Sequence, residues 1–452
     1  MSAPAPSADE ARLRRDLGTW LAMAITVNAM VGTGVFRLAP TILRLSGSLT
    51  HALLAWLAGG FVALCGALCM AELATSMPRA GGIYEYLRQA YGPTIGFWYG
   101  WTRLWLLGPS AAGSYARLAA EALGATFGWA PSALRDTLVA CTVLGVCTLV
   151  NMRGVRAASA GQAVLTAIKL AGLVLLGLAC LVATPSADVP SAVPSLAAPS
   201  WAGLCAALVS VMWAYDGWAD VASLSGEARE PARTLPRALV IGTAVVTVGY
   251  LLVNLGYARV LGTAGLAAST EGANMVAMNA ADAALGAHGR RVLAALVFTS
   301  CVGACTVGVL TGSRVFVSMA SDGLLVRWLG YVSPRNGAPL RAVVLVSSLG
   351  MIYLSARTFE QLTNAFVAGM FPFYLLAIVA VAVMRRRAPA REGTFRAPVY
   401  PLLAALFSAG TLALLWGSAS ELTPMTAVAT GIMLAGLPVG YLAQRHAACT
   451  HA

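Results

Sequence analysis

The sequence predicts an all-α membrane protein with twelve transmembrane helices. Of its 452 residues, 58% are apolar and 11% are charged, which leaves too little polar surface for an ordinary water-soluble enzyme. A helix rises 1.5 Å per residue, so about 20 apolar residues cross the roughly 30 Å of hydrocarbon in a bilayer. Such stretches recur along the chain. The net charge of +12 does not indicate a nucleic-acid partner, because the basic residues stand at the ends of apolar stretches rather than in one block.

Twelve apolar stretches are long enough to be expected as spans, and the fourth and ninth are the shortest. The first six run over 17–40, 49–74, 94–123, 134–150, 162–183 and 202–224. The last six run over 238–257, 292–320, 342–354, 362–384, 399–416 and 425–443. Residues 1–16 are expected to form a disordered cytoplasmic tail, and residues 444–452 a second cytoplasmic tail.

The basic residues predict the orientation of the chain. Arginines are most frequent in the tails and in the even-numbered loops, so the positive-inside rule places both termini in the cytoplasm. The expected location is the plasma (inner) membrane, crossed many times. The loops are too short to hold a soluble catalytic or sensor domain, so the function is expected to lie within the bilayer.

Span 1 contains glycines at mid-depth, in the sequence Val31, Gly32, Thr33, Gly34. A membrane helix satisfies its own backbone hydrogen bonds, so an opened backbone is expected only where it faces protein or a watery cavity. Opened here, the amides of Gly32, Thr33 and Gly34 would face one cavity and would suit a carboxylate. The alternative is that the two glycines only allow close helix packing.

Span 6 contains a second unusual segment, the sequence Trp213, Ala214, Tyr215, Asp216, Gly217. Carbonyls freed by a break there would suit an ammonium group. Matched interruptions five helices apart indicate a transporter built from inverted repeats, here residues 17–183 and 202–384, with two further helices over 399–443. Facing amides and carbonyls fit a zwitterion, and an α-amino acid is the obvious one.

Lys169 is the single lysine beside 29 arginines, and it falls within span 5. Arginine stays protonated in proteins, whereas a buried lysine can lose its proton, so this position is expected to need a compact or a titratable cation. The alternative is that Lys169 extends its ammonium group to the membrane surface, which an arginine could do equally well.

Carboxylates at membrane depth are functional candidates by default. Asp216 could meet a cationic substrate, a proton or Lys169, or could accept hydrogen bonds from local backbone amides. Asp220 is expected to cap or solvate the inner half of span 6. Arg103, in span 3, could pair with a neighbour or lie at an interface, and the sequence does not decide between them.

These motifs resemble the amino acid/polyamine/organocation superfamily of LeuT-type secondary transporters, and within it the L-type amino acid transporter branch. The resemblance covers nearly the whole chain. It rests on the glycine motif of span 1, the Trp-Ala-Tyr-Asp-Gly-Trp sequence of span 6, and the segments 78–84, 151–154, 230–236 and 313–323. It implies a fold of five plus five helices in inverted repeat, with helices 1 and 6 broken and two extra C-terminal helices.

The resemblance also implies roles for individual residues. The aromatic residue matching Trp213 closes over the substrate, and the neighbouring carbonyls hold the amino group of the substrate. Lys169 matches a lysine that takes the place of a sodium ion in sodium-coupled members. It would bridge the first helix to the eighth helix near Thr299 and Ser300, so sodium coupling is not expected.

Three positions depart from the family pattern. Asn28 stands where relatives usually have glycine, which would alter the neighbours of Lys169 or offer the substrate an amide. Ser321 replaces a common basic residue, which puts a cytoplasmic gate contact in doubt. Residues 124–132 contain no cysteine, so no disulfide-linked heavy chain is expected.

The expected function is sodium-independent exchange of small neutral amino acids by alternating access. Proton-coupled uptake through Lys169, and exchange of cationic amino acids through Asp216, are the alternatives. An enzyme is not expected, because the four histidines lie at or outside the ends of the spans and no His-Glu-x-x-His motif occurs. No cofactor or metal is expected, and the partners are the amino-acid substrate and the lipid bilayer.

Overall fold

The computed structural model describes residues 17–32, 34–77, 81–130, 132–185, 196, 198–269, 275–387, 394–420 and 424–449. The predicted tail over 1–16 therefore lies outside the described residues. Within them, the regular elements are helices, and the β-type pairing is an isolated bridge between Leu17 and Ala228. The predicted all-α class is confirmed for this part of the chain.

The helices of the first half, in chain order, are α1 (Thr19–Met30), α2 (Gly34–Arg37), α3 (Ala39–Ser46), α4 (Leu49–Ser76), α5 (Ile83–Tyr91), α6 (Pro93–Thr102), the π-helical turn η2 (Arg103–Leu107), α7 (Gly108–Phe127), α8 (Ala133–Met152) and α9 (Val155–Val182). Those of the second half are α10 (Trp201–Ala214), the 3-10 helix η3 (Asp220–Glu227), α11 (Pro231–Ala268), α12 (Val276–Ser321), the 3-10 helix η5 (Arg327–Gly330), α13 (Leu340–Ala356), α14 (Phe359–Arg387), α15 (Tyr400–Ser420) and α16 (Pro424–Cys449).

Seven helical stretches among the described residues have the length and apolar composition to cross a membrane, and four shorter apolar helices accompany them. Each of the twelve predicted spans overlaps at least one helix. The short fourth and ninth spans correspond to α8, with 20 residues, and α13, with 17 residues. The last helix continues to Cys449, through part of the segment predicted as a tail.

Two helices run well beyond the predicted span ends. Both α11 and α12 contain a bend at a glycine with positive φ, at Gly262 (φ 67°) and Gly286 (φ 70°). Glycine adopts this conformation without the clash that a Cβ would cause. The extra helical segment follows the predicted span in α11, after Gly262, and precedes it in α12, before Gly286.

A π-helical turn interrupts the third predicted span between α6 and α7. Pro109 has no N–H to donate to the carbonyl of Trp105, four residues earlier. The amide of Gly108 instead donates to the carbonyl of Arg103, five residues earlier. The extra residue widens the helix at this point, as π-bulges do.

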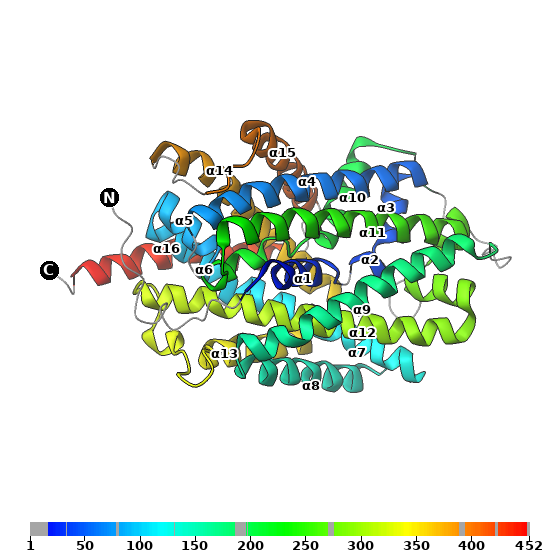
Figure 1. The fold of residues 1–452 in the computed structure, drawn as a ribbon, viewed down its shortest axis with the longest axis horizontal. Coiled ribbons are helices and arrows are strands. Elements are labelled where there is room, and N and C mark those ends of the chain that lie inside the picture. The colour runs from blue at the N-terminus through cyan, green and yellow to red at the C-terminus, as the bar shows by residue number, and fades with distance from the viewer. Residues whose placement is uncertain are drawn as a thin grey trace.

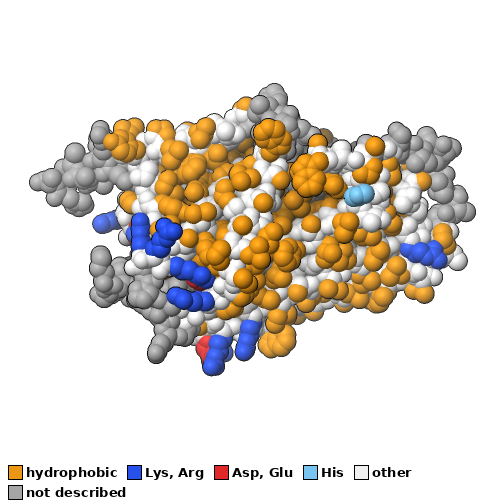
Figure 2. Space-filling model, turned by 90° about the horizontal axis from the view of Figure 1, so that it is seen from above, with side chains coloured by type: hydrophobic (Ala, Val, Ile, Leu, Met, Phe, Trp, Pro, Cys, Tyr) orange, Lys and Arg blue, Asp and Glu red, His pale blue; other side chains and the backbone are white. Residues whose placement is uncertain are grey.

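The long helices run roughly side by side along the long axis of the molecule (Figure 1). Helix α1 lies in the middle, where it packs against α9, α11 and α12. The face in Figure 2 is largely covered by apolar side chains, and most of the basic side chains visible there gather toward the end that holds α5. Apolar cover with charge at an end is the pattern of a protein surrounded by lipid.

Candidate functional site

The backbone of span 1 breaks immediately after Met30. The amide of Val31 still bonds to the carbonyl of Val27 at 2.8 Å, but that of Gly32 turns to Met30, two residues back, also at 2.8 Å. Helix α2 begins at Gly34. Thr33 lies outside the described residues. The carbonyl of Asn28 therefore loses the helical donor that Gly32 would supply, and it needs a partner from elsewhere.

Lys169 supplies one such partner. Its side chain is fully buried, and its ammonium group donates to the carbonyl of Val31 at 2.6 Å, to the carbonyl of Asn28 at 3.1 Å and to the side-chain Oδ1 of Asn28. The alternative of a lysine extended to the membrane surface is therefore wrong. The ammonium group lies at the end of α1, where the helix dipole also favours a cation.

Helix α12 contributes a second donor at the same place. The hydroxyl of Ser300 donates to the carbonyl of Val31 at 2.9 Å. Thr299 differs from the expectation, since its hydroxyl bonds to the carbonyl of Leu296 in its own helix at 2.8 Å, as threonines in helices often do. Lys169 and Ser300 thus join α9, α1 and α12, and Thr299 does not take part.

Asn28 is accommodated by a glycine on the facing helix. A Cβ added to Gly303 of α12 would lie 2.8 Å from the side-chain amide of Asn28. The volume that Asn28 adds to α1 is thus balanced by the absence of a side chain at Gly303, and the amide is placed where it accepts from Lys169. No sequence pattern marks this pairing, because the two residues are distant in the chain.

Span 6 breaks where the sequence predicts. Helix α10 ends at Ala214, the amide of Asp216 bonds to the carbonyl of Trp213 at 3.1 Å, and Gly217 has φ of +104°. The 3-10 helix η3 then begins at Asp220. The five residues Trp213 to Gly217 are thus a helix end and a turn rather than continuous helix.

The two breaks pack directly against each other. A Cβ on Gly34 would lie 2.4 Å from the Cβ of Ala214, and a Cβ on Gly217 would lie 2.7 Å from the carbonyl carbon of Ala29. Real Cβ atoms do not approach so closely, so both positions require glycine. The packing alternative for the glycines is therefore correct for Gly34, and it holds together with the break rather than instead of it.

Tyr250 of α11 joins the two breaks, and the sequence did not single it out. Its hydroxyl lies 2.9 Å from the carbonyl of Met30 and 2.9 Å from that of Ala214, the last residues of α1 and α10. Its ring packs edge-on against Trp56, with 5.3 Å between centroids. A tyrosine in an apolar span is unremarkable by pattern, so no sequence signal marked it.

Replacing Tyr250 with Phe is expected to destabilise the protein, because the buried carbonyls of Met30 and Ala214 lose the one hydroxyl hydrogen that they share. An unsatisfied buried group costs about 1–3 kcal/mol. The melting temperature in detergent should fall. Tyr257→Phe is the matched control, since Tyr257 is buried in the same helix and its hydroxyl has no partner among the described residues. Equal effects of the two substitutions would contradict the role given to the Tyr250 hydroxyl.

The carboxylates of span 6 have partners on the neighbouring helices. Tyr374 of α14 donates its hydroxyl to Oδ1 of Asp216 at 2.7 Å, and its ring stacks on Trp218. Asp220 pairs with Arg103 at 3.6 Å, which decides the open question about Arg103 in favour of an ion pair. Asp216 accepts a tyrosine hydroxyl, whereas the Lys169 ammonium donates to Asn28 of α1 and to Val31, the residue that follows α1.

Aromatic residues border the breaks. Trp213 is 8% exposed and meets Phe366 of α14 edge-on, with centroids 5.4 Å apart. A Cβ on Gly32 would lie 3.2 Å from the ring of Tyr115 in α7. Beyond the break, Arg37 lies 3.6 Å from a carboxylate oxygen of Glu121 and packs over the ring of Phe359. Side chains of α7 and α14 thus pack beside the two breaks.

Backbone hydrogen bonding also connects the start of span 1 to the segment that follows span 6. The isolated bridge links Leu17, just before α1, to Ala228, just after η3, and the amide of Arg229 donates to the carbonyl of Leu17 at 3.1 Å. Spans 1 and 6 therefore touch both at their breaks and at these ends.

Comparison with known proteins places this chain in a family. Residues 17–440 match the family model described as amino acid permease. The chain is 29% identical over 435 residues to the serine/threonine exchanger SteT of Bacillus subtilis, covering 95% of this chain and 97% of that protein. It is 30% identical over 401 residues to the b(0,+)-type amino acid transporter 1 of Mus musculus, covering 88% and 81%.

A third relative is the human large neutral amino acids transporter small subunit 2, which is 27% identical over 441 residues, covering 95% of this chain and 80% of that protein. These relatives are transporters or exchangers rather than enzymes. The family model spans most of the chain, including both broken helices and Lys169. The chain belongs to the amino acid permease family, within the superfamily that its sequence motifs resemble.

Proposed function

We propose that this protein is a sodium-independent exchanger of small neutral L-amino acids that works by alternating access. The observation that carries this proposal is the contact of the Lys169 ammonium with the carbonyls of Asn28 and Val31. The family resemblance puts a sodium ion at this place in sodium-coupled members. A lysine fixed there supplies the positive charge from the protein itself, so the cycle needs no sodium.

The substrate class follows from the two breaks. The first amides of the helix that resumes at Gly34 have no helical acceptors, and suit a carboxylate. The end of α10 offers backbone carbonyls beside Trp213 to an ammonium group. The close packing of Gly34 on Ala214 leaves little room, which favours a small side chain. Similarity to a serine/threonine exchanger supports the same choice.

Alternating access would move the broken helices against the others. In an exchanger, the empty carrier must reorient poorly. Lys169 and Ser300 hold the end of α1 on α9 and α12, and this contact would set the barrier. The five-plus-five repeat over 17–183 and 202–384, the inner-membrane location and the cytoplasmic termini are part of the proposal. Labelling of single cysteines introduced into successive loops, from either side of sealed vesicles, tests the orientation.

Counterflow tests the function itself. Proteoliposomes loaded with unlabelled serine should take up labelled serine much faster than empty ones, without sodium and at equal pH on both sides. Proton-coupled uptake is the second candidate, because Lys169 is the one basic residue at this depth that can release a proton. Uptake that responds to a pH gradient but not to internal amino acid would refute exchange and support proton coupling.

A cationic substrate would require Asp216 to face the site with a free charge. Asp216 already accepts a hydrogen bond from Tyr374, and the amide oxygen of an asparagine can accept the same bond. The affinity of Asp216→Asn for neutral amino acids is therefore expected to stay within about twofold to threefold of the wild-type value. This corresponds to a change in binding free energy of less than about 1 kcal/mol. Binding is measured by competition against thermal melting with a panel of amino acids. Complete loss would show that the negative charge itself is needed.

A further inference from the structure

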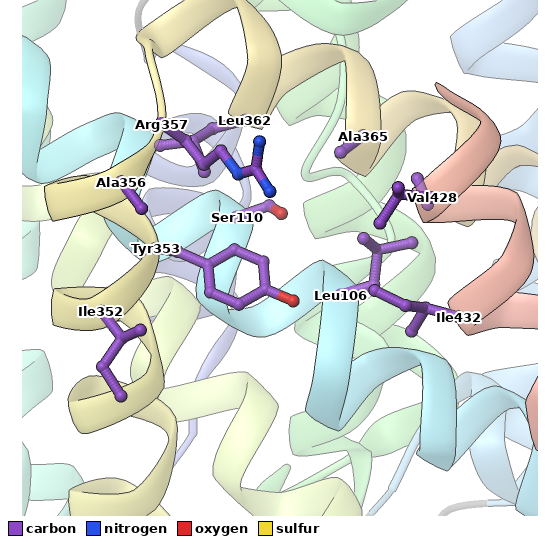
Figure 3. Close-up of a pocket in the computed structure, with 11 residues that line it drawn as sticks. Leu106, Ser110, Ile352, Tyr353, Ala356, Arg357, Leu362, Ala365, Val428 and Ile432 are labelled. Carbon is purple, nitrogen blue, oxygen red and sulfur yellow. The ribbon is translucent and has the colours of Figure 1, made fainter. Parts of the chain in front are cut away.

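A cavity lies away from the two breaks, between η2, α7, α13, α14 and α16. It has a volume of about 190 Å³. Its walls are mostly apolar, including Leu106, Ala365 and Ala429, while Ser110, Tyr353 and Arg357 contribute polar groups. Figure 3 shows the guanidinium of Arg357 and the hydroxyl of Tyr353 directed toward the cavity from α13, with Ser110 beside them.

The π-helical turn shapes one wall of this cavity. Because Pro109 cannot donate to the carbonyl of Trp105, that carbonyl needs another donor, and the hydroxyl of Tyr353 supplies it. Leu106 and Ser110 flank the widened turn and line the cavity. Tyr353 thereby ties α13 to the turn at the edge of the cavity.

Ser110 is the unusual group in this wall. Its side chain is fully buried, and its hydroxyl has no hydrogen-bond partner among the described residues. A buried hydroxyl without a partner costs free energy, so such a group is expected to have one under working conditions. Since it lines the cavity, that partner can be a polar group of a molecule bound there.

The charge and depth of Arg357 indicate what that molecule is. Arg357 is exposed and follows the last residue of α13, a helix of 17 residues. Such a helix is about 25 Å long, close to the thickness of the hydrocarbon, so its ends lie at the level of the lipid headgroups. The described residues that line the cavity include no Asp or Glu, so an anion is favoured and a zwitterion finds no carboxylate for its ammonium group.

We propose that this cavity binds an anionic phospholipid of the surrounding bilayer. One acyl chain enters between α7, α13 and α16, and the phosphate pairs with Arg357, whose planar guanidinium matches phosphate oxygens. An ester oxygen near the headgroup accepts from the hydroxyl of Ser110. An apolar cavity of about 150 Å³ takes up benzene, so this one has room for a segment of roughly six to eight carbons. The proposal does not depend on the transport mode.

The test compares two lipids that differ in headgroup charge. The purified full-length protein in dodecyl maltoside is titrated with dioleoylphosphatidylglycerol or dioleoylphosphatidylcholine, and bound lipid is counted by native mass spectrometry beside thermal melting. Phosphatidylglycerol is expected to bind more tightly and to raise the melting temperature more. In Arg357→Gln this preference should fall about tenfold, as loss of one charged pair of about 1.4 kcal/mol predicts.

Matched variants separate this site from general lipid binding. Arg259→Gln removes an exposed arginine from α11, on the same predicted side of the membrane, and should keep the preference. Ala365→Leu fills the apolar part of the cavity and should weaken binding of both lipids. Ala429→Leu fills the same cavity from α16. This variant is used instead if Ala365→Leu does not fold.

Two results would overturn the proposal. One is equal binding of the two lipids by the wild-type protein, or a preference that Arg357→Gln leaves intact. The other is stabilisation by serine that Arg357→Gln abolishes while lipid binding persists, which would make the cavity a second amino-acid site. Neither result bears on counterflow, so failure here is distinct from failure of the proposed exchange.

Discussion

Lys169→Met is expected to weaken amino-acid binding about tenfold to hundredfold and to reduce exchange accordingly. Methionine keeps most of the volume of the side chain and removes its charge. The carbonyl of Asn28 then loses its hydrogen bond from the ammonium group, and that of Val31 keeps the one from the hydroxyl of Ser300. A buried carbonyl left unpaired costs about 1–3 kcal/mol, and each 1.4 kcal/mol is tenfold in an equilibrium constant. Thermal-shift titration with serine and counterflow in proteoliposomes measure the two effects.

Thr166→Val is the matched control for Lys169→Met. Thr166 lies one helical turn earlier on α9 and donates its hydroxyl to the carbonyl of Ala24 in α1 at 3.0 Å. Its loss should lower the melting temperature while the affinity for serine stays within a few-fold. If Lys169→Met binds and exchanges serine like the wild type, the ammonium does not organise the break, and the argument for sodium independence loses its basis.

Gly217→Ala is expected to have the second largest effect, a severe loss of stability and of transport. At φ of +104° an alanine is strained, and its Cβ would lie 2.7 Å from the carbonyl carbon of Ala29. Strain of this kind costs about 1–3 kcal/mol, and forcing an extra methyl into a packed contact costs about as much again. The neighbouring atoms are backbone, so they cannot rotate away. The yield of folded protein and its melting temperature are the measurements.

The control for Gly217→Ala is a glycine with open space. Gly308 lies within α12, and a Cβ there would meet nothing within 4 Å. Gly308→Ala should be neutral or stabilising by up to about 1 kcal/mol, since alanine favours a helix. A Gly217→Ala protein as stable as Gly308→Ala would show that the two breaks are not held in the contact described above.

Both breaks could be predicted from the sequence, because paired glycines or an acidic residue are unfavourable in a lipid-facing helix. Each of these signals lies within one short segment, so it can be recognised without knowing the fold. The sequence also marked Lys169, as the one lysine of the chain. The sequence did not mark three residues of the site, because each is common in an apolar helix and contacts a partner far away in the chain. They are Tyr250, Tyr374 and Gly303. Hydrophobicity alone cannot reveal such pairs.

Contacts between helices could be predicted only in part from motifs. The resemblance named both Ser300 and Thr299; the hydroxyl of Ser300 bonds to the carbonyl of Val31, whereas that of Thr299 bonds within its own helix. Neighbouring residues on a helix point about 100° apart, so a motif match cannot assign both to one contact. Arg103 and Asp220 were seen separately as charges at depth, and only the fold brings them together.

The bridge between Leu17 and Ala228 connects the segment before α1 to the segment after η3. These two residues are more than 200 positions apart in the chain. Movement of one of these ends would act on the other through the hydrogen bond from the Arg229 amide to the Leu17 carbonyl. In the proposed alternating-access cycle, this link would make opening of that face one synchronous event with one activation barrier, rather than two independent movements.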